Sequence, residues 1–206
     1  MKAFNGYENA KKAAASMGSG EKLPVGAYVC QIKKVQYVPG ENGYSDRIDL
    51  LFDICEGEQM NFFKNQWDNN TSEDKKWKGK KSLYVPKDDG SEKDEWTKNA
   101  FAKWVNAFED SNEGYKWDWN ENKWKGLLIG IAFGETGTVI EGREITYVEP
   151  RFPADVKKVR SGNVPEAKFV AKNGYTGKGS NGSSDNGSSD NGSGWHTAKE
   201  EELPFS

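Results

Sequence analysis

Residues 27–56 read AYVCQIKKVQYVPGENGYSDRIDLLFDICE, and this stretch decides the fold. The pair Asn42-Gly43 is the strongest short-range signal for a hairpin turn, so it predicts antiparallel strands over residues 27–38 and 47–56. In the second strand every other residue is apolar, which indicates a half-buried strand. These apolar residues are Ile48, Leu50, Phe52 and Ile54. We expect the opposite face, which carries Asp49 and Asp53, to be solvated.

The first strand changes the side on which its apolar residues lie. Val35 and Tyr37 take the inward positions when they are paired across the turn. Nearer the start of the strand, the apolar residues are Tyr28, Cys30 and Ile32. One extra residue at positions 33–34, a β-bulge, returns both halves of the strand to the same face.

The bulge also determines where the two cysteines lie. It sets Cys30 opposite Ile54 and turns Cys55 to the other face of the sheet. We therefore expect Cys30 to be buried and Cys55 to point away from the interior. Both are expected to be free thiols, which suits a reducing cytoplasm.

The rest of the chain predicts one long helix and three more strands. In chain order the expected elements are a short helix over 4–17, a polar loop over 61–80, a strand over 82–85, a helix over 91–109, a strand over 127–133, a turn over 134–142 and a strand over 143–148. Residues 156–164 either extend the sheet or lie over it. The long helix is capped by Ser91, and its expected inward face consists of Trp96, Ala100, Phe101, Trp104, Val105 and Phe108.

This order of elements places the long helix between strands three and four. It fits a mainly β, α+β chain folded as a five-stranded OB-like barrel, a fold whose second and third strands bind oligonucleotides. Other α+β folds share the same order, so the order alone does not identify the barrel.

Residues 171–194 are rich in Gly, Ser, Asn and Asp and contain NGSSD twice, at 181–185 and 186–190. Such a composition offers too little apolar surface to offset the entropy of ordering, so we expect a disordered, flexible tether. The chain then ends WHTAKEEELPFS, residues 195–206. A tether that ends in an acidic and apolar tip indicates a segment that binds another protein, with Phe205 as its anchor.

This end of the chain resembles the C-terminal tail of bacterial and phage single-stranded DNA-binding proteins, which combine an OB-fold body, a polar linker and an acidic tip. The matching residues are Glu200, Glu201, Glu202, Leu203, Pro204 and Phe205. The resemblance implies that the protein coats single-stranded DNA without strong sequence preference. It also implies that the tip binds replication and recombination proteins. The chain departs from the family pattern at Ser206, which moves the terminal carboxylate one residue beyond the phenylalanine.

The expected organisation has four parts: a helical extension over 1–23, an OB-fold body over 24–170, a linker over 171–194 and the tip over 195–206. The whole chain has a net charge of −3, and three lysines and five acidic residues lie after Val170, so the body is close to neutral. A strongly basic domain is typical of duplex-DNA binders. A near-neutral body is compatible with single-strand binding when basic residues gather locally and aromatic side chains share the contact.

Lysines and tryptophans alternate in two parts of the body. Indole rings stack on bases and lysines neutralise phosphates, so this pattern is typical of sequence-tolerant binding to single strands. The expected DNA-binding residues are Lys75, Lys76, Trp77, Lys78, Lys80, Lys81, Trp117, Trp119, Lys123, Trp124 and Lys125. The cluster around Trp77 falls between strands two and three, where the resemblance implies a long arm that reaches along the strand.

The sequence argues against an enzyme. The only histidine, His196, lies in the tail, two cysteines cannot form a four-cysteine zinc site, and the phosphate-binding motif GxxxxGK[ST] is absent. We therefore expect no catalytic residue, no metal and no cofactor.

Two alternatives stay open. One is an adaptor that recruits partners but does not itself bind DNA. The other is a metal-dependent nuclease or other DNA-processing enzyme, because the many carboxylates do not exclude a magnesium site. Because the chain has no apolar run of about 18 residues, we expect a cytoplasmic protein with no membrane partner. Whether it forms a homo-oligomer is left open.

Overall fold

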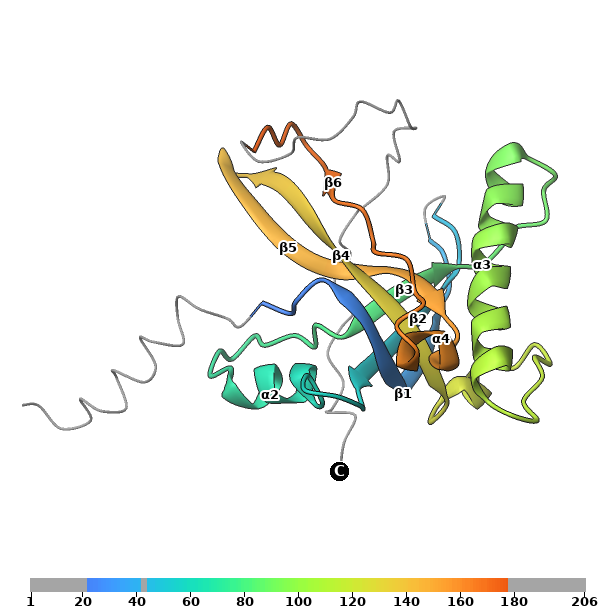
Figure 1. Cartoon of the computed structure of the whole chain (residues 1–206). Coiled ribbons are helices and arrows are strands. Elements are labelled where there is room, and N and C mark those ends of the chain that lie inside the picture. Colours follow the sequence, from blue (N-terminus) through green and yellow to red (C-terminus); the bar gives the residue numbers. More distant parts are fainter. Residues whose placement is uncertain (1–21, 42–43, 178–206) are drawn as a thin grey trace, which may run out of the picture.

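The computed structural model describes residues 22–41 and 44–177 and shows a mixed α+β fold that is mainly β (Figure 1). Its strands are β1 (Gly26–Val38), β2 (Arg47–Ile54), β3 (Lys80–Tyr84), β4 (Leu128–Ile140), β5 (Arg143–Ala154) and β6 (Val170–Ala171). Its helices are α2 (Phe62–Asn69), α3 (Glu92–Ser111) and α4 (Val156–Arg160), with a 3-10 turn, η1, at Glu121–Trp124. The helix expected over 4–17, the turn centre Asn42-Gly43 and the acidic tip lie outside the described residues.

The strands form one open sheet in the order β3-β2-β1-β4-β5, and β6 pairs with β4 in parallel. All other pairs are antiparallel. Within the described ranges no backbone ladder joins the edge strands β3 and β5, so the expected barrel is not closed. One side chain spans that gap, because Lys81 Nζ donates to the Pro150 carbonyl at 3.2 Å.

The expected bulge is present in β1. Cys30 pairs with Ile54 and Ile32 pairs with Phe52, whereas Val35 pairs with Leu50, so the register shifts between Ile32 and Lys34. Both halves of β1 therefore present apolar side chains to the same face. The register prediction is confirmed, and with it the burial of Cys30, which has no accessible surface.

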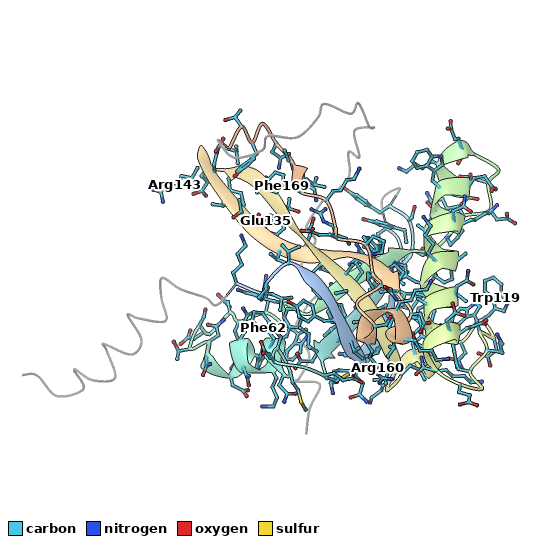
Figure 2. All side chains as sticks on the ribbon, in the orientation of Figure 1. Phe62, Trp119, Glu135, Arg143, Arg160 and Phe169 are labelled. Carbon is cyan, nitrogen blue, oxygen red and sulfur yellow. The ribbon has the colours of Figure 1, made fainter. Side chains whose placement is uncertain are left out.

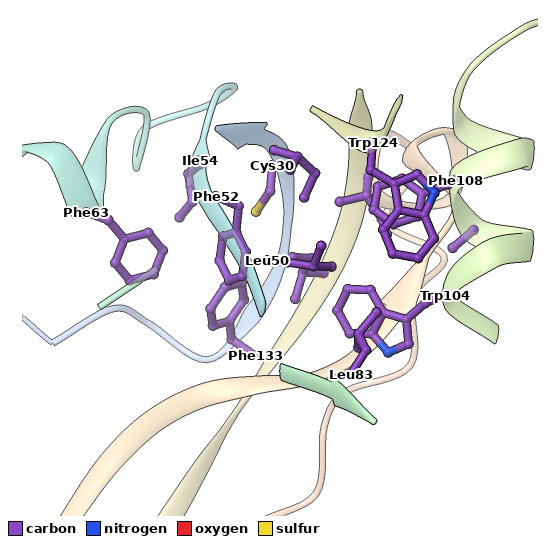
Figure 3. Close-up of a cluster of buried hydrophobic side chains, with 14 of the residues drawn as sticks. Cys30, Leu50, Phe52, Ile54, Phe63, Leu83, Trp104, Phe108, Trp124 and Phe133 are labelled. Carbon is purple, nitrogen blue, oxygen red and sulfur yellow. The ribbon is translucent and has the colours of Figure 1, made fainter. Parts of the chain in front are cut away.

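The core lies between the inner face of the sheet and one side of α3 (Figure 3). The inward residues of β2 are all buried, as expected, and they belong to the same buried cluster as Trp104 and Phe108 of the helix. Two residues expected on the inward face of α3 are not there, because Trp96 is 64% exposed and Ala100 is also exposed. The helix diverges from the sheet toward its N-terminus. The buried part of its inward face is therefore shorter than the apolar spacing indicates.

The hairpin of β4 and β5 is longer than expected. The sequence predicts a turn over 134–142, but β4 continues to Ile140 and only Glu141 and Gly142 form the turn, both with positive φ. The glycines within β4 serve close packing instead of turning the chain. A Cβ at Gly134 would lie 2.8 Å from the Cβ of Ala167.

A strap formed by residues 161–177 lies along this hairpin. Its Val170 pairs with Thr136, Asn173 Nδ2 donates to Thr138 Oγ1 at 3.1 Å, and the Thr176 backbone N–H donates to Glu144 Oε1 at 2.8 Å. The expectation that the flexible linker begins at residue 171 is therefore wrong. Residues 171–177 pack on the body because β4 offers them a backbone edge and polar partners.

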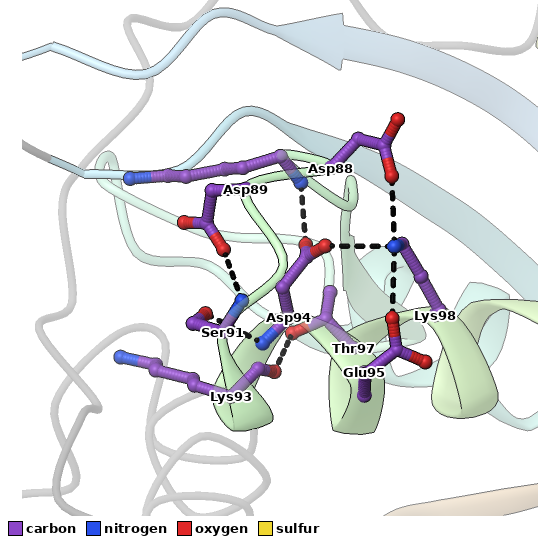
Figure 4. Close-up of polar contacts among 9 residues, drawn as sticks. Asp88, Asp89, Ser91, Lys93, Asp94, Glu95, Thr97 and Lys98 are labelled. Carbon is purple, nitrogen blue, oxygen red and sulfur yellow. Dashed lines mark hydrogen bonds and ion pairs between the residues drawn. The ribbon is translucent and has the colours of Figure 1, made fainter.

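A polar cluster fixes the start of α3 (Figure 4). The Ser91 hydroxyl accepts the backbone N–H of Asp94 at 3.1 Å, which satisfies one of the free N–H groups of the first turn. Lys98 Nζ lies 2.8 Å from Asp88, 2.9 Å from Glu95 and 3.2 Å from Asp94. These carboxylates raise the pKa of Lys98. The cap expected at Ser91 is confirmed.

The two thiols provide a test of this register. Cys30 is fully buried and burial raises the pKa of its thiol, whereas Cys55 is half-buried outside the core cluster and its pKa is also raised by burial. Titration with a thiol reagent should count two thiols after denaturation and at most one before it. In the Cys55→Ser variant, the native protein should react only at the rate of unfolding. Rapid reaction of that variant would contradict the register.

Candidate nucleic-acid interface

The outer face of β1, β2 and β3 carries most of the cations on the sheet. Residues paired across antiparallel strands share a face, and the register aligns Lys34 with Leu51 and Leu51 with Lys80. Arg47 and Tyr84 form another pair on this face. The cationic face is defined by Lys33, Lys34, Arg47, Lys80 and Tyr84. Of these, only Lys80 was expected from the sequence to bind DNA, although Lys33-Lys34 at the bulge is a visible signal.

Asp49 lies on the same face but is not solvated, which corrects the sequence expectation. Only 2% of its surface is accessible, because Arg47 Nε lies 3.2 Å from one carboxylate oxygen and Lys80 Nζ lies 2.8 Å from the other. The Ser82 hydroxyl donates to Asp49 at 2.5 Å. Strand alternation correctly predicted that Asp49 lies on the outer face. The carboxylate is buried there because long cationic side chains cover it.

Asp53 is also buried, and it caps helix α2. Its carboxylate accepts the backbone N–H groups of Ile54, Phe63 and Lys64 at 2.9 Å, 3.0 Å and 3.1 Å. Burial raises the pKa of Asp53, and the three N–H donors partly oppose that shift. Both strand carboxylates are therefore engaged in structural contacts, which the alternating pattern of β2 did not predict.

The arm between β2 and β3 is anchored by Trp77. Its indole N–H lies 3.1 Å from the carbonyls of Phe52 and Gly79, and its ring packs against the core cluster. The Trp67 ring lies 6.1 Å from the Trp77 ring, and Lys75 Nζ lies 4.8 Å from the Trp67 centroid. We expected Trp77 on a loop, where it does lie. Its ring is half-buried, however, and holds the arm to the edge of β2.

The lysines around Trp77 divide into two groups. Lys76 and Lys78 are exposed. Lys80 is paired with Asp49, and Lys81 reaches across to Pro150 and has a pKa that burial lowers. The sequence cannot separate these roles, because strand β3 begins within the lysine run and directs its side chains alternately outward and inward.

The second aromatic cluster belongs to the loop that follows α3. Trp124 is fully buried between Phe108 and Trp117, with ring centroids 4.7 Å from each. It offers no free ring face, so its expected role in DNA binding is corrected to a core residue. Trp117 is half-buried, whereas Trp119 is 83% exposed and projects from the body (Figure 2).

Several polar contacts hold this loop in place. Glu109 accepts the Trp117 backbone N–H at 2.9 Å and Lys116 Nζ at 2.8 Å, and the lysine lowers the pKa of the Glu109 carboxyl. Asp118 and Lys123 form an ion pair on either side of Trp119. Trp119 itself has a φ of 64°, a left-handed backbone that bulky residues rarely adopt. Such strain persists only where the surroundings impose it, and it concentrates at functional sites.

The loop adjoins the cationic face through the bulge of β1. Gly126 donates its N–H to the Ile32 carbonyl at 2.8 Å, Ile32 donates to the Leu127 carbonyl at 3.0 Å, and Gln31 Nε2 donates to the Gly126 carbonyl at 3.3 Å. These bonds place the exposed Lys125, one residue before Gly126, beside β1 at its bulge. One cation of the loop, Lys125, therefore lies beside the strand that carries Lys33 and Lys34.

The residues expected to bind partner proteins, Glu200 to Phe205, lie outside the described residues. No protein-family model matches the chain, and no curated protein matches it in sequence. In the part of the chain that is described, no group of three or more His, Cys, Asp or Glu residues could hold a metal ion. No helix there is long and apolar enough to cross a membrane.

The different burial of the tryptophans predicts different effects on stability. Trp124→Ala removes a fully buried ring and should lower the free energy of unfolding by about 3–5 kcal/mol. Trp119→Ala should change it by less than about 0.5 kcal/mol, because the ring is exposed. Trp77→Ala should fall between the two, since the ring is half-buried and bonded. Urea unfolding followed by circular dichroism measures all three, and a large loss of stability in Trp119→Ala would contradict the assignment.

Proposed function

We propose that this protein binds single-stranded DNA with little sequence preference, through the cationic face and the Trp119 loop. The observation that carries the proposal is Trp119, a bulky ring held in a left-handed backbone and 83% exposed, in a loop that also carries Lys116 and Lys123. Lys116 and Lys123 keep 80% and 55% of their side-chain surface accessible. A fixed ring face between exposed cations is suited to stacking on a base while the lysines neutralise adjacent phosphates.

The strand order supports an OB-like body for this function. The order β3-β2-β1-β4-β5, with the one long helix between β3 and β4, is consistent with a partly open five-stranded barrel whose free edges are β3 and β5. Strands two and three of that fold carry the oligonucleotide site, and here the cationic face lies on β1, β2 and β3. The arm that contains Trp67 and Trp77 adjoins the same strands.

The cationic face suits a flexible ligand that passes over it. Two carboxylates, Asp49 and Asp53, share this face with four cations, which are Lys33, Lys34, Arg47 and Lys80. The carboxylate of Asp53 already accepts N–H groups of α2. The face therefore keeps an excess of positive charge although the body as a whole is near neutral. Local cations of this kind neutralise phosphates without the overall basic charge that duplex binders carry.

The ring of Trp119 provides the first test of DNA binding. Trp119→Ala should weaken binding of oligo-dT by roughly fivefold to 150-fold, since stacking on one aromatic is worth about 1–3 kcal/mol. Fluorescence anisotropy of a labelled oligo-dT measures the change. Trp96→Ala is the matched control, because it removes another exposed tryptophan that lies on α3. If oligo-dT binds neither variant nor the natural protein at low salt, the adaptor function replaces this proposal.

The cations predict how binding depends on salt. Affinity should fall linearly with the logarithm of salt concentration, with a slope of about −0.7 per neutralised phosphate on a single strand. Lys34→Gln should make that slope less steep by about 0.7, because one phosphate contact is lost. Lys93→Gln, on the exposed start of α3, should leave the slope unchanged. Equal slopes for the natural protein and Lys34→Gln would remove this residue from the interface.

We also propose that the C-terminal tip recruits replication and recombination proteins. Deletion of residues 200–206 should leave oligo-dT affinity equal or slightly higher, because an acidic segment can compete for a basic surface. Phe205→Ala should abolish capture of partner proteins, since one buried aromatic anchor usually dominates such a contact. The measurement compares the proteins that the immobilised natural chain and Phe205→Ala retain, with Thr197→Ala as the control. Identical captured sets would contradict the recruiting role.

A further inference from the structure

The open seam between β3 and β5 is crossed by one lysine that lacks a counter-ion. Lys81 pairs with Leu50, whose side chain is fully buried, so both residues lie on the inner face of the sheet. The Lys81 ammonium donates a hydrogen bond to the Pro150 carbonyl of β5 at 3.2 Å. It forms no ion pair with any carboxylate of the described ranges. The neighbouring Lys80 differs, because it lies on the outer face and is paired with Asp49.

The charges around Lys81 do not balance. Those that act on it belong to Glu149, Arg151 and Lys172. The Glu149 carboxylate is already shared, because Arg151 Nη1 lies 2.9 Å and Lys172 Nζ lies 3.2 Å from its Oε1 atom. The Thr136 hydroxyl donates to the same oxygen at 2.8 Å. Three cations against one carboxylate leave two positive charges in excess.

The surroundings make this excess charge costly. Only 17% of the Arg151 side chain and 24% of the Glu149 side chain are accessible. Burial lowers the pKa of Lys81, Glu149 opposes that shift, and the two neighbouring cations add to it. Buried charges in proteins are normally paired, because an isolated ion loses more hydration than it regains. An anion bound at the seam would supply the missing negative charge.

The donors that remain at the seam fit a phosphate group. An ammonium has three N–H donors, and Lys81 uses one for Pro150 while Lys172 uses one for Glu149. Among the described residues, two donors on each lysine are therefore left for a ligand. A phosphate group offers several acceptor oxygens and carries about 1.5 to 2 negative charges near pH 7. It matches the excess charge, whereas a carboxylate would neutralise only half of it.

We propose that the seam between β3 and β5 binds a phosphate group between Lys81 and Lys172, beside Arg151. Lys172 belongs to the strap, which lies along β4 (Figure 1). The bound group would connect β3 to the strap and to β5, and so bridge the seam that the backbone leaves open. The group comes as free inorganic phosphate or as a phosphate of a DNA strand, which have the same chemistry. The site is separate from the cationic face, which lies on the outer side of the sheet.

Thermal unfolding of the full-length protein tests the site, with sodium phosphate compared with sodium chloride at equal ionic strength. Phosphate should raise the unfolding temperature of the natural protein with a saturable component, because the anion binds the folded state. Lys81→Met keeps the apolar stem and removes the charge. It should raise the phosphate concentration at half effect by roughly tenfold to 150-fold, since a charge-assisted hydrogen bond is lost. Lys172→Met should act in the same way and leaves the inner face of the sheet unchanged.

Two other lysines serve as matched controls. Lys168 belongs to the same strap, is exposed and forms no ion pair within the described ranges, so Lys168→Met should keep the natural response. Lys34→Gln removes a cation of the outer face and should also keep it. Phosphate also stabilises folded proteins in general, because it is excluded from their surfaces. That general effect should persist in Lys81→Met and Lys172→Met, whereas the saturable component should not.

Oligo-dT distinguishes the two sources of the phosphate group. If the group belongs to a DNA strand, oligo-dT should compete with inorganic phosphate, and Lys81→Met should make the salt slope of oligo-dT binding less steep by about 0.7. If the group is free phosphate, the protein should bind oligo-dT and phosphate together, and the slope should not change. Either result supports a phosphate site at the seam.

Three results would overturn the proposal. The first is an equal response of the natural protein to phosphate and to chloride. The second is a full response to phosphate in both Lys81→Met and Lys172→Met. The third is loss of the response in Lys34→Gln alone, which would assign the anion to the outer face. None of them affects the Trp119 titration, which tests DNA binding separately.

Discussion

The extra residue in β1 is the constraint on which the rest of the structure depends. Without the bulge between Ile32 and Lys34, one half of β1 would turn its apolar side chains to solvent, because a strand alternates its faces strictly. The bulge keeps Cys30 and Val35 on the same side of the sheet. It also places Ile32 where its N–H and carbonyl bond to Leu127 and Gly126, so the chain after α3 is fixed against β1. One irregularity thus joins the core to the loop that presents Trp119.

The tryptophans show how packing assigns different roles to similar local sequences. Trp117, Trp119 and Trp124 lie within eight residues of one another, in a stretch that also contains Lys116, Lys123 and Lys125. Trp124 fills the space between α3 and the sheet, Trp117 stacks on it, and Trp119 is left outside as the third ring of the series. The core has room for the ring of Trp124 and part of the ring of Trp117. The ring of Trp119 is therefore available to a ligand.

Packing also determines the roles of the charged residues of β2. Asp49 and Asp53 alternate with apolar residues, a pattern that predicts a solvated face, yet both are buried. Asp49 forms ion pairs with both Arg47 and Lys80, and Asp53 supplies the cap that α2 needs at its start. A buried carboxylate is tolerated because each one is hydrogen-bonded. The cations that remain form the surface on which the proposed function rests.

By itself, the sequence determined the order of the five main strands and the long helix, the bulge in β1, the burial of Cys30 and the Ser91 cap. These features follow from local patterns: strict alternation, turn residues and cap chemistry act over a few neighbouring positions. Only the tertiary structure decided that Trp96 is exposed, that Trp124 is buried, and that residues 171–177 pack along the hairpin. Each of these outcomes depends on a distant element, such as the divergence of α3 from the sheet or the Gly134 surface that receives Ala167. Local sequence does not predict such contacts, because several chemically similar side chains could fill the same limited space in the core.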